Sequence, residues 1–281
     1  MLILCAVLCG AHAWAQLPQP VPTTAGPERG ALVLIGGGAN RPAFVQRFVQ
    51  LAGGPDAKVV VIPTTLEDDR LTPEGLEQLR SSMQRILGMN HVTVMHTRDP
   101  KQADLPDFVE PLRHATGVWM LGGNENYLIK AYFGTRVETE IKALLARGGV
   151  IGGTSAGAIV QASLLINGKI VDSPDHPGSK TVRIEGTQAG FGLLTNSIVF
   201  VHWSQRKNQD VLAEGMATQP GVLGIAIDEA TAAVIEGNHL EVVGDGNVGI
   251  YDGKTHNGKP YLVLGPGQRF DLNRRMELPV I

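Results

Sequence analysis

Short apolar runs alternate with longer amphipathic stretches up to about residue 165. Five runs are apolar on both faces of an extended chain, which is typical of buried strands: Ala31–Ile35, Lys58–Ile62, His91–Met95, Gly117–Leu121 and Gly149–Ile151. Four stretches between them have helical spacing and a charged face: Pro42–Ala52, Pro73–Leu87, Asp107–His114 and Arg136–Arg147. Strands separated by helices indicate a parallel sheet that is covered on both faces. The pattern therefore predicts a three-layer α/β fold with a doubly wound, mostly parallel sheet.

The last third of the chain has a different pattern. Residues 168–191 are polar and predict a loop, whereas Gln205–Gly215 has the spacing of a helix. Short alternating runs then follow one another: Val222–Ile227, Thr231–Ile235, His239–Val243, Val248–Tyr251 and Pro260–Leu264. These runs predict an antiparallel extension built of hairpins. We expect residues 31–281 to form a single domain with a β-rich C-terminal extension.

The N-terminal segment differs from the rest in carrying no charge. Residues 1–15 contain an apolar stretch and end in Ala13-Trp14-Ala15, which predicts a signal peptide that is cleaved before Gln16. The expected location is therefore periplasmic or secreted. Residues 16–30, rich in proline and threonine, predict a flexible leader. No later stretch reaches the roughly 20 apolar residues of a membrane span, so no membrane association is expected after processing.

Composition limits the classes of function that need consideration. The chain has 281 residues, of which 43% are hydrophobic, and its 24 basic and 27 acidic residues are well mixed. This balance does not favour nucleic-acid binding. Both cysteines lie in the expected signal peptide, so the mature protein would have no thiol or disulfide. His91 with His96, and Asp172 with Asp175 and His176, lack the spacing of a metal site, and no metal or cofactor is expected.

The segment Gly153-Thr154-Ser155-Ala156-Gly157 is a G-x-S-x-G motif at a strand-to-helix switch. An apolar run precedes it, and the helix-like Ala158–Ala162 follows. Glycines on both sides of the serine allow a sharp turn that exposes the hydroxyl group. Ser155 is therefore a candidate nucleophile. The alternative interpretation is a turn of small residues that lets a helix pack close to a strand.

A serine nucleophile requires a base to accept its proton and an acid to orient that base. His202 ends an apolar run, where a base would be held rigidly, although a buried core histidine is the alternative interpretation. Four acidic residues are candidates for the third member. Asp228 and Glu229 follow a predicted strand, and Asp172 and Asp175 follow the helix after Ser155. The spacing alone leaves this choice open.

Acyl transfer also requires amide donors for the developing oxyanion. The amide of Ala156, directly after the serine, is the first candidate, and Gly123, at the end of the preceding predicted strand, is the second. The glycines at positions 36–38 have neither dinucleotide-binding nor P-loop spacing, so nucleotide binding is not predicted.

Three motifs occur in order along the chain: Met120–Asn124, Gly152–Ala158 and Gly224–Ala232. Together they resemble the cyanophycinase and aspartyl dipeptidase family of serine peptidases, over a region from about Ala31 to about Leu272. That family resembles class I glutamine amidotransferases in fold, with a flavodoxin-like sheet. The resemblance implies Ser155 as nucleophile, His202 as base and Glu229 as orienting acid. Asp172 stays as an alternative acid, because the dipeptidase branch takes its acid from the loop after the serine.

The chain departs from the cyanophycinase pattern around the substrate. Gly123-Asn124-Glu125 stands where cyanophycinases usually carry Gly-Asp-Gln, and Phe200 replaces an aspartate before the base. Of the arginines that usually follow the base, only Arg206 is clearly matched. A carboxylate at Glu125 would disfavour an anionic aspartyl group unless Arg206 or a raised pKa compensates. We therefore expect Asn124, Glu125 and Arg206 to bind the substrate, a short peptide or isopeptide different from cyanophycin.

Two other functions fit the same residues. The altered surroundings at Glu125 and Phe200 would suit a non-catalytic peptide-binding module on the same scaffold. The same three catalytic residues would also serve an esterase or amidase for small molecules. The sequence is compatible with a homodimer.

Overall fold

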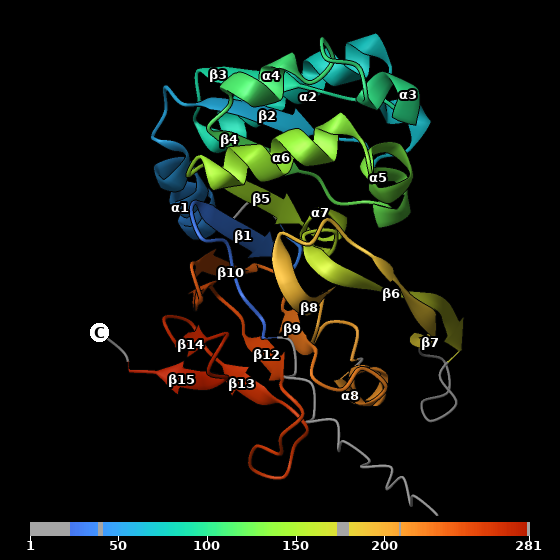
Figure 1. Ribbon diagram of the computed structural model, residues 1–281, viewed down its shortest axis with the longest axis vertical. Coiled ribbons are helices and arrows are strands. Elements are labelled where there is room, and N and C mark those ends of the chain that lie inside the picture. Colours follow the sequence, from blue (N-terminus) through green and yellow to red (C-terminus); the bar gives the residue numbers. More distant parts are fainter. Residues whose placement is uncertain (1–22, 39–41, 173–179, 208, 280–281) are drawn as a thin grey trace, which may run out of the picture.

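The structure is a computed structural model that describes residues 23–38, 42–172, 180–207 and 209–279, with side chains outside residues 169–184 (Figure 1). Its helices are α1 (Pro42–Ala52), α2 (Pro73–Leu87), α3 (Pro100–Ala103), α4 (Glu110–His114), α5 (Glu125–Tyr132), α6 (Arg136–Ala146), α7 (Ala156–Ile159) and α8 (Gln209–Ala217). A short 3₁₀ helix spans Asp68–Arg70. Among the described residues, the strands form two sheets.

The larger sheet has the order β15-β14-β11-β10-β1-β5-β4-β2-β3. Its strands are β1 (Ala31–Ile35), β2 (Lys58–Ile62), β3 (His91–Val94), β4 (Gly117–Met120), β5 (Val150–Thr154), β10 (Thr231–Glu236), β11 (His239–Gly244), β14 (Arg269–Asp271) and β15 (Met276–Leu278). The five strands from β1 to β3 in this order are parallel, and β10 joins β1 in the antiparallel sense. The smaller sheet, in the order β13-β12-β9-β8-β6-β7, contains β6 (Ala162–Asp172), β7 (Lys180–Ala189), β8 (Leu194–Val201), β9 (Leu223–Ile227), β12 (Val248–Tyr251) and β13 (Leu262–Leu264).

Helices cover both faces of the parallel part of the larger sheet. Successive side chains of a strand point to opposite faces, and β1 follows this rule with five buried residues. Ala31, Val33 and Ile35 pack in one cluster with residues of α1 and α2, and Leu32 and Leu34 pack in another with residues of α4, α5 and α6. The prediction of a doubly wound α/β fold is confirmed.

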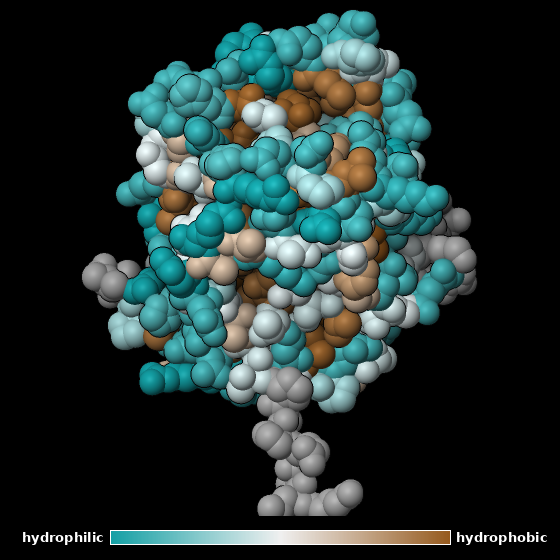
Figure 2. All heavy atoms as spheres, turned by 45° about the horizontal axis from the view of Figure 1, so that its top comes forward, coloured by the Kyte–Doolittle hydropathy of each residue, from teal (hydrophilic) through white to brown (hydrophobic). Residues whose placement is uncertain are grey.

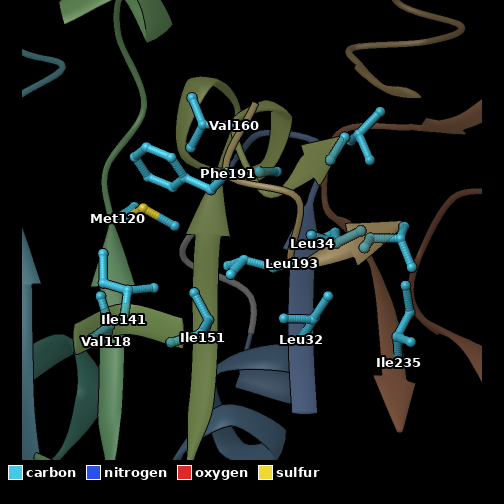
Figure 3. Packing of buried hydrophobic residues seen from close by; sticks show 14 of the residues in the cluster. Leu32, Leu34, Val118, Met120, Ile141, Ile151, Val160, Phe191, Leu193 and Ile235 are labelled. Atoms are coloured by element: carbon cyan, nitrogen blue, oxygen red, sulfur yellow. The ribbon is translucent and has the colours of Figure 1, made fainter. Parts of the chain in front are cut away.

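The smaller sheet shares a core with the larger one. The cluster that contains Leu32 and Leu34 continues into Val199 of β8, Ile225 of β9 and Ile250 of β12. Figure 3 shows part of this core, in which residues of β1, β4, β5 and β10 belong to one cluster with Phe191 and Leu193, which precede β8. The shared core holds the ends of β1, β5, β8 and β9 at fixed positions relative to one another.

The helix α2 illustrates how local sequence sets the predicted boundaries. Thr72 is its N-cap, and the Thr72 hydroxyl accepts a hydrogen bond from the amide of Gly75 at 3.1 Å. Pro73 occupies the first turn, where a missing N–H costs nothing. Gly88 ends the helix with a φ of 63°, a conformation that favours glycine. The predicted and observed limits of this helix are identical.

The prediction of a loop over residues 168–191 is wrong. Most of this stretch forms the hairpin of β6 and β7, which are paired from Leu164 with Ala189 to Asp172 with Lys180 (Figure 1). The register shifts at Asn167 and Gly168, so an irregularity interrupts the ladder. That irregularity, with charged residues along both strands, concealed the alternation typical of a strand.

The predicted C-terminal extension is only partly antiparallel. β9 pairs with β8 in the parallel sense, and β10 leaves this sheet to join β1 in the larger one. The predicted helix Ala158–Ala162 is also wrong in its limits, because α7 ends at Ile159 and β6 begins at Ala162. Periodicity identifies a strand but not its neighbours, and the shared core determines which sheet each strand joins.

The expected flexible leader is fixed at its end. Thr24 is fully buried, and its hydroxyl donates to the carbonyl of Asn196 at 2.9 Å. The amide of Gly26 donates to Oδ1 of Asn238 at 3.2 Å. These contacts attach the segment to both sheets. The expected signal peptide, residues 1–15, and residues 16–22 lie outside the described residues.

Polar and charged side chains cover most of the face in Figure 2, with apolar patches between them. The large hydrophobic side chains that are exposed among the described residues are Ile86, Leu105, Phe133, Val263 and Met276. Within the described part of the chain, no helix is long and apolar enough to cross a membrane.

Candidate active site

Ser155 lies at the carboxyl end of β5, in the middle of the larger sheet. Its φ of 51° and ψ of −115° form a conformation that L-residues rarely adopt, and it is the N-cap of α7. The Ser155 amide donates to the carbonyl of Ile35 at 2.9 Å, which fixes the turn against β1. Ser155 is half-buried, and its hydroxyl is directed to the imidazole of His202.

The glycines on either side of Ser155 are required by close backbone approach. A Cβ at Gly153 would lie 2.1 Å from the carbonyl oxygen of Gly157, and a Cβ at Gly157 would lie 2.4 Å from that of Met120. Both distances are shorter than any real contact of a Cβ atom. The G-x-S-x-G pattern therefore indicates a turn too tight for a side chain at the positions two before and two after the serine.

His202 and Glu229 reach Ser155 from the smaller sheet. β8 and β9 are parallel neighbours, with Val201 opposite Ile227, so the residues that follow them emerge at the same edge. The amide of His202 donates to the carbonyl of Gly36 at 3.0 Å, directly after β1. The end of β1 thus connects the loop after β8, which carries His202, to the end of β5, which carries Ser155.

The three side chains form a continuous hydrogen-bonded series. Oγ of Ser155 lies 3.0 Å from Nε2 of His202, and Nδ1 of His202 lies 2.7 Å from Oε1 of Glu229. The side chain of His202 is 16% exposed, so its imidazole is shielded yet still reachable, and that of Glu229 is 46% exposed. A serine, an imidazole and a carboxylate in this order can move a proton from the hydroxyl to the imidazole.

The neighbouring acid, Asp228, has a different position. It is 3% exposed, and its two oxygens accept hydrogen bonds from the amides of Ser204 at 2.8 Å and Asn247 at 3.0 Å. Asp228 therefore fixes the loops around the site. Asp172 ends β6 and its side chain is outside the described part, as is Asp175. The carboxylate that contacts His202 is that of Glu229.

The three glycines after β1 have a role that the sequence alone did not indicate. Gly37 has a φ of 132°, and a Cβ on it would lie 2.5 Å from Cε1 of His202 and 3.2 Å from Cγ of Glu229. The carbonyl of Gly37 accepts from the amide of Ala230 at 2.9 Å. The backbone at Gly37 thus packs on the histidine and the carboxylate. The run of glycines after β1, the neighbour of β5, was the sequence signal that could have indicated this close backbone packing.

The candidate oxyanion donors lie beside Ser155. A Cβ at Gly122 would be 3.2 Å from Cβ of Ser155, so this loop contacts the serine directly. The amides of Gly123 and Ala156 donate no hydrogen bond within the part of the chain that the structure describes. Free amide N–H groups beside a serine can donate hydrogen bonds to the negatively charged oxygen that develops during acyl transfer.

The three residues expected to bind substrate have separate environments. Asn124 is the N-cap of α5, and its Oδ1 accepts from the amide of Asn126 at 3.0 Å. Glu125 is the first residue of that helix and is half-buried. Arg206 is exposed, and its amide donates to the carbonyl of His202 at 3.0 Å. The helix α5 was not predicted, although an asparagine followed by a glutamate is a signal for a helix start.

The described residues contain no group of three or more His, Cys, Asp or Glu side chains that could hold a metal ion. His91 is exposed at the start of β3, whereas His96 is half-buried after it, with Nδ1 3.0 Å from Oγ1 of Thr64. Burial, assisted by the positive charge of Arg98, lowers the pKa of His96.

Comparisons with known proteins show the family to which the chain belongs. The sequence profile described as peptidase family S51 matches residues 32–243. A cyanophycinase from Geminocystis herdmanii (strain PCC 6308) is 29% identical over 273 residues, covering 90% of this chain and 96% of that protein. A cyanophycinase from Nostoc sp. (strain PCC 7120) is also 29% identical over 273 residues, covering 89% and 88%. The crystal structure of a peptidase from an acI-B1 Actinobacterium is similar with a TM-score of 0.67 and 25% identity, covering 88% of this chain and 98% of that one.

Proposed function

Because the chain belongs to peptidase family S51, we propose that it is a serine peptidase that hydrolyses a peptide or isopeptide amide through an acyl-enzyme. The single observation that carries this proposal is the hydrogen-bonded series from Ser155 through His202 to Glu229. The alternative acid is not needed, because the Glu229 carboxylate already contacts Nδ1 of His202.

In the first half of the reaction, Oγ of Ser155 attacks the carbonyl carbon of the substrate. Its proton passes to Nε2 of His202, 3.0 Å away, while Glu229 holds Nδ1–H and stabilises the imidazolium. The tetrahedral intermediate then collapses, the C–N bond breaks and His202 gives the proton to the leaving amine. An ester between the acyl group and Ser155 remains.

In the second half, water replaces the amine. His202 takes a proton from the water, whose oxygen attacks the ester carbonyl. Collapse of this second intermediate returns the proton to Oγ of Ser155 and releases a carboxylic acid. The serine and histidine end in their starting states, and no cofactor enters the proposed steps.

The amides of Gly123 and Ala156 stabilise the oxyanion in both intermediates. Removing one such donor typically costs about 3 to 4 kcal/mol of transition-state stabilisation. Neither N–H group donates to an acceptor within the described residues, so both are free to bind the oxyanion, which supports this role.

Substrate selection in this proposal comes from the two sides of Ser155. Asn124 and Glu125 follow β4, which pairs with β5 on one side, and Arg206 follows His202 at the end of β8 on the other. A substrate crossing the serine would meet a carboxylate on one side and a guanidinium on the other. Screening a peptide and isopeptide library with Glu125→Gln and Arg206→Gln tests this, and unchanged preferences would contradict it.

The nucleophile is tested with a fluorophosphonate, which forms a covalent adduct with an activated serine. Intact-mass spectrometry should find one adduct on the wild type, mapped to the peptide that contains Ser155, and none on Ser155→Ala. Absence of an adduct on the folded wild type would overturn the serine mechanism and favour a binding module. Hydrolysis of simple esters without any peptide cleavage would favour a small-molecule esterase.

We also propose that residues 1–15 are an export signal, supported by their apolar and uncharged composition. Expression of the full chain in a Gram-negative host, followed by cell fractionation and intact mass, tests this. A periplasmic product that begins at Gln16 is expected, and an uncleaved cytoplasmic product would contradict it.

A further inference from the structure

The loop that follows β2 contacts the proposed oxyanion loop through one residue, Thr65. This residue is 1% exposed, and its hydroxyl donates to the carbonyl of Gly122 at 2.8 Å. Its own carbonyl accepts from the amide of Asn124 at 2.9 Å. Thr65 therefore holds the residues on both sides of Gly123. A Cβ at Gly123 would lie 2.2 Å from the Thr65 carbonyl oxygen, so the contact leaves no space for a side chain there.

The first of these hydrogen bonds bears directly on the proposed oxyanion donor. The carbonyl of Gly122 and the N–H of Gly123 belong to one planar trans peptide and point in opposite directions. Fixing the carbonyl therefore fixes the direction of the N–H. A peptide between two glycines has the widest conformational freedom of any, so its orientation needs an external constraint.

Thr65 is held in turn by Arg98, which follows β3. The Arg98 guanidinium donates to the carbonyl of Thr64 and to that of Leu66, at 2.5 Å for the latter. It also pairs with Asp68 at 3.0 Å and lies over the ring of Tyr127 in α5, 3.9 Å from its centroid. A guanidinium is a rigid, planar fork, and here it spans the two carbonyls that flank Thr65.

We propose that Thr65 and Arg98 form a clamp that presets the Gly123 amide for the oxyanion. They are positioning residues, since neither touches the reacting atoms, and the inference rests on the proposed peptidase function. Donors that are oriented before the reaction stabilise the transition state without reorganisation, whereas a freely rotating amide loses part of this effect.

The contacts of Thr65 and Arg98 are not needed merely to attach the loop after β2 to the rest of the protein. Thr64 is already anchored, because its hydroxyl contacts Nδ1 of His96 at 3.0 Å and the buried hydroxyl of Tyr132 at 2.7 Å. Arg98 instead holds the carbonyls on both sides of Thr65, and the Thr65 hydroxyl holds the carbonyl of Gly122. Both residues therefore act on the peptide before Gly123.

The first part of the test compares Thr65→Val, which removes the hydroxyl at equal size, with Thr65→Ser, which keeps it. Thr65→Val should lower kcat about 10- to 100-fold with little change in KM, because only the transition state uses the Gly123 amide. Affinity for a peptide aldehyde, which forms a tetrahedral adduct with serine, should fall in parallel, and affinity for the product acid should not. Thr65→Ser should restore kcat to within about threefold of the wild type.

Arg98→Gln should lower kcat in the same selective way, by about tenfold, and Arg80→Gln serves as the matched control. Arg80 lies on the exposed side of α2, where it pairs with Glu77, and it is remote from the clamp in the hydrogen-bond pattern. Values of kcat and aldehyde affinity within about twofold of the wild type in both Thr65→Val and Arg98→Gln would overturn the clamp.

Hydrogen–deuterium exchange separates failure of the clamp from failure of the peptidase function. Peptides that span residues 121–126 should exchange faster in Thr65→Val and Arg98→Gln than in the wild type or Arg80→Gln. If the wild type neither cleaves peptides nor binds the aldehyde, the peptidase proposal fails, and the exchange result still decides on the clamp. Unchanged exchange in both variants would overturn it.

Discussion

Gly37 lies directly against the imidazole of His202. A Cβ on this glycine would be 2.5 Å from Cε1 and 2.8 Å from Nδ1 of the histidine, and its φ is 132°. His202 itself has a φ of 55°, so the histidine backbone is also in an unusual conformation. The candidate base is therefore held by a backbone surface as well as by Ser155 and Glu229.

Replacing Gly37 by alanine should displace the imidazole and slow catalysis. A displacement of about 1 Å in a catalytic group can cost about 10²-fold in rate, and we expect a fall in kcat/KM of at least that order. Gly38→Ala is the matched control, because its φ is also positive and its nearest neighbour would be 3.4 Å away. Kinetics and fluorophosphonate labelling rates check this, and equal rates in Gly37→Ala and the wild type would contradict it.

Glu229→Gln should reduce activity without unfolding the protein. The amide of glutamine cannot balance an imidazolium, and it can select the wrong tautomer of His202. We expect a loss in kcat of about 10³- to 10⁴-fold, with a melting temperature close to that of the wild type since the side chain is 46% exposed. Steady-state kinetics and thermal unfolding measure the two effects. A variant with nearly full activity would exclude Glu229 as the orienting acid.

The adjacent substitution, Asp228→Asn, should act on stability. Both carboxylate oxygens of Asp228 accept hydrogen bonds from backbone amides. An asparagine would direct its NH₂ group, a donor, at one of these two backbone N–H groups. Leaving a buried donor without an acceptor costs about 1 to 3 kcal/mol in the free energy of unfolding. Urea denaturation should detect this loss. If Asp228→Asn were as stable as the wild type, these two hydrogen bonds would contribute little.

The parallel half of the fold could be predicted because its apolar runs are buried on both faces. The first strand was predicted with its observed limits, Ala31–Ile35, since all five side chains are buried and three glycines follow. The tight turn at Ser155 could also be predicted, because Gly153 and Gly157 mark a turn that only glycines allow. The pairing of His202 with Glu229 needed the family resemblance, since the spacing alone left four acids open.

What the sequence did not reveal depends on contacts between segments far apart. Gly37 contacts a histidine 165 positions later because the end of β8 meets the end of β1, where the His202 amide donates to the carbonyl of Gly36. Thr65, after β2, holds the carbonyl of Gly122, and Arg98, after β3, holds the two carbonyls that flank Thr65. Neither residue carries a local motif. Periodicity reports burial along one element, whereas these contacts arise from the order of strands in the sheet.

Ser155→Gly should make the protein more stable while abolishing turnover. A serine at a φ of 51° and a ψ of −115° is strained, typically by about 1 to 3 kcal/mol, and glycine adopts this conformation freely. The larger entropy of glycine in the unfolded chain offsets about 0.5 to 1 kcal/mol, so a net gain of about 1 kcal/mol is expected. Ser155→Ala keeps the strain and is the control. If Ser155→Gly were less stable than Ser155→Ala by the full entropy of glycine, about 0.5 to 1 kcal/mol, the turn would store no strain.

The free energy of unfolding should also fall in mild acid because of His96. Burial first, and the charge of Arg98 second, lower the pKa of this histidine from its ordinary value of 6.5, and the charge of Asp68 opposes them. As the pH drops below about 6.5, the unfolded chain takes up this proton before the folded one, so the contribution of the neutral histidine to stability is lost. Above that pH both states are neutral, and the contribution is fully present.

His96→Asn keeps a polar atom near the position of Nδ1, opposite Thr64, but removes the titrating group. Its unfolding free energy should therefore depend less on pH than that of the wild type between about pH 5 and pH 7. Urea denaturation at intervals across this range, with both proteins in the same buffers, measures the difference in slope. Parallel curves would mean that His96 takes up its proton equally well in the folded and unfolded states, contrary to the lowering of its pKa by burial and by the charge of Arg98.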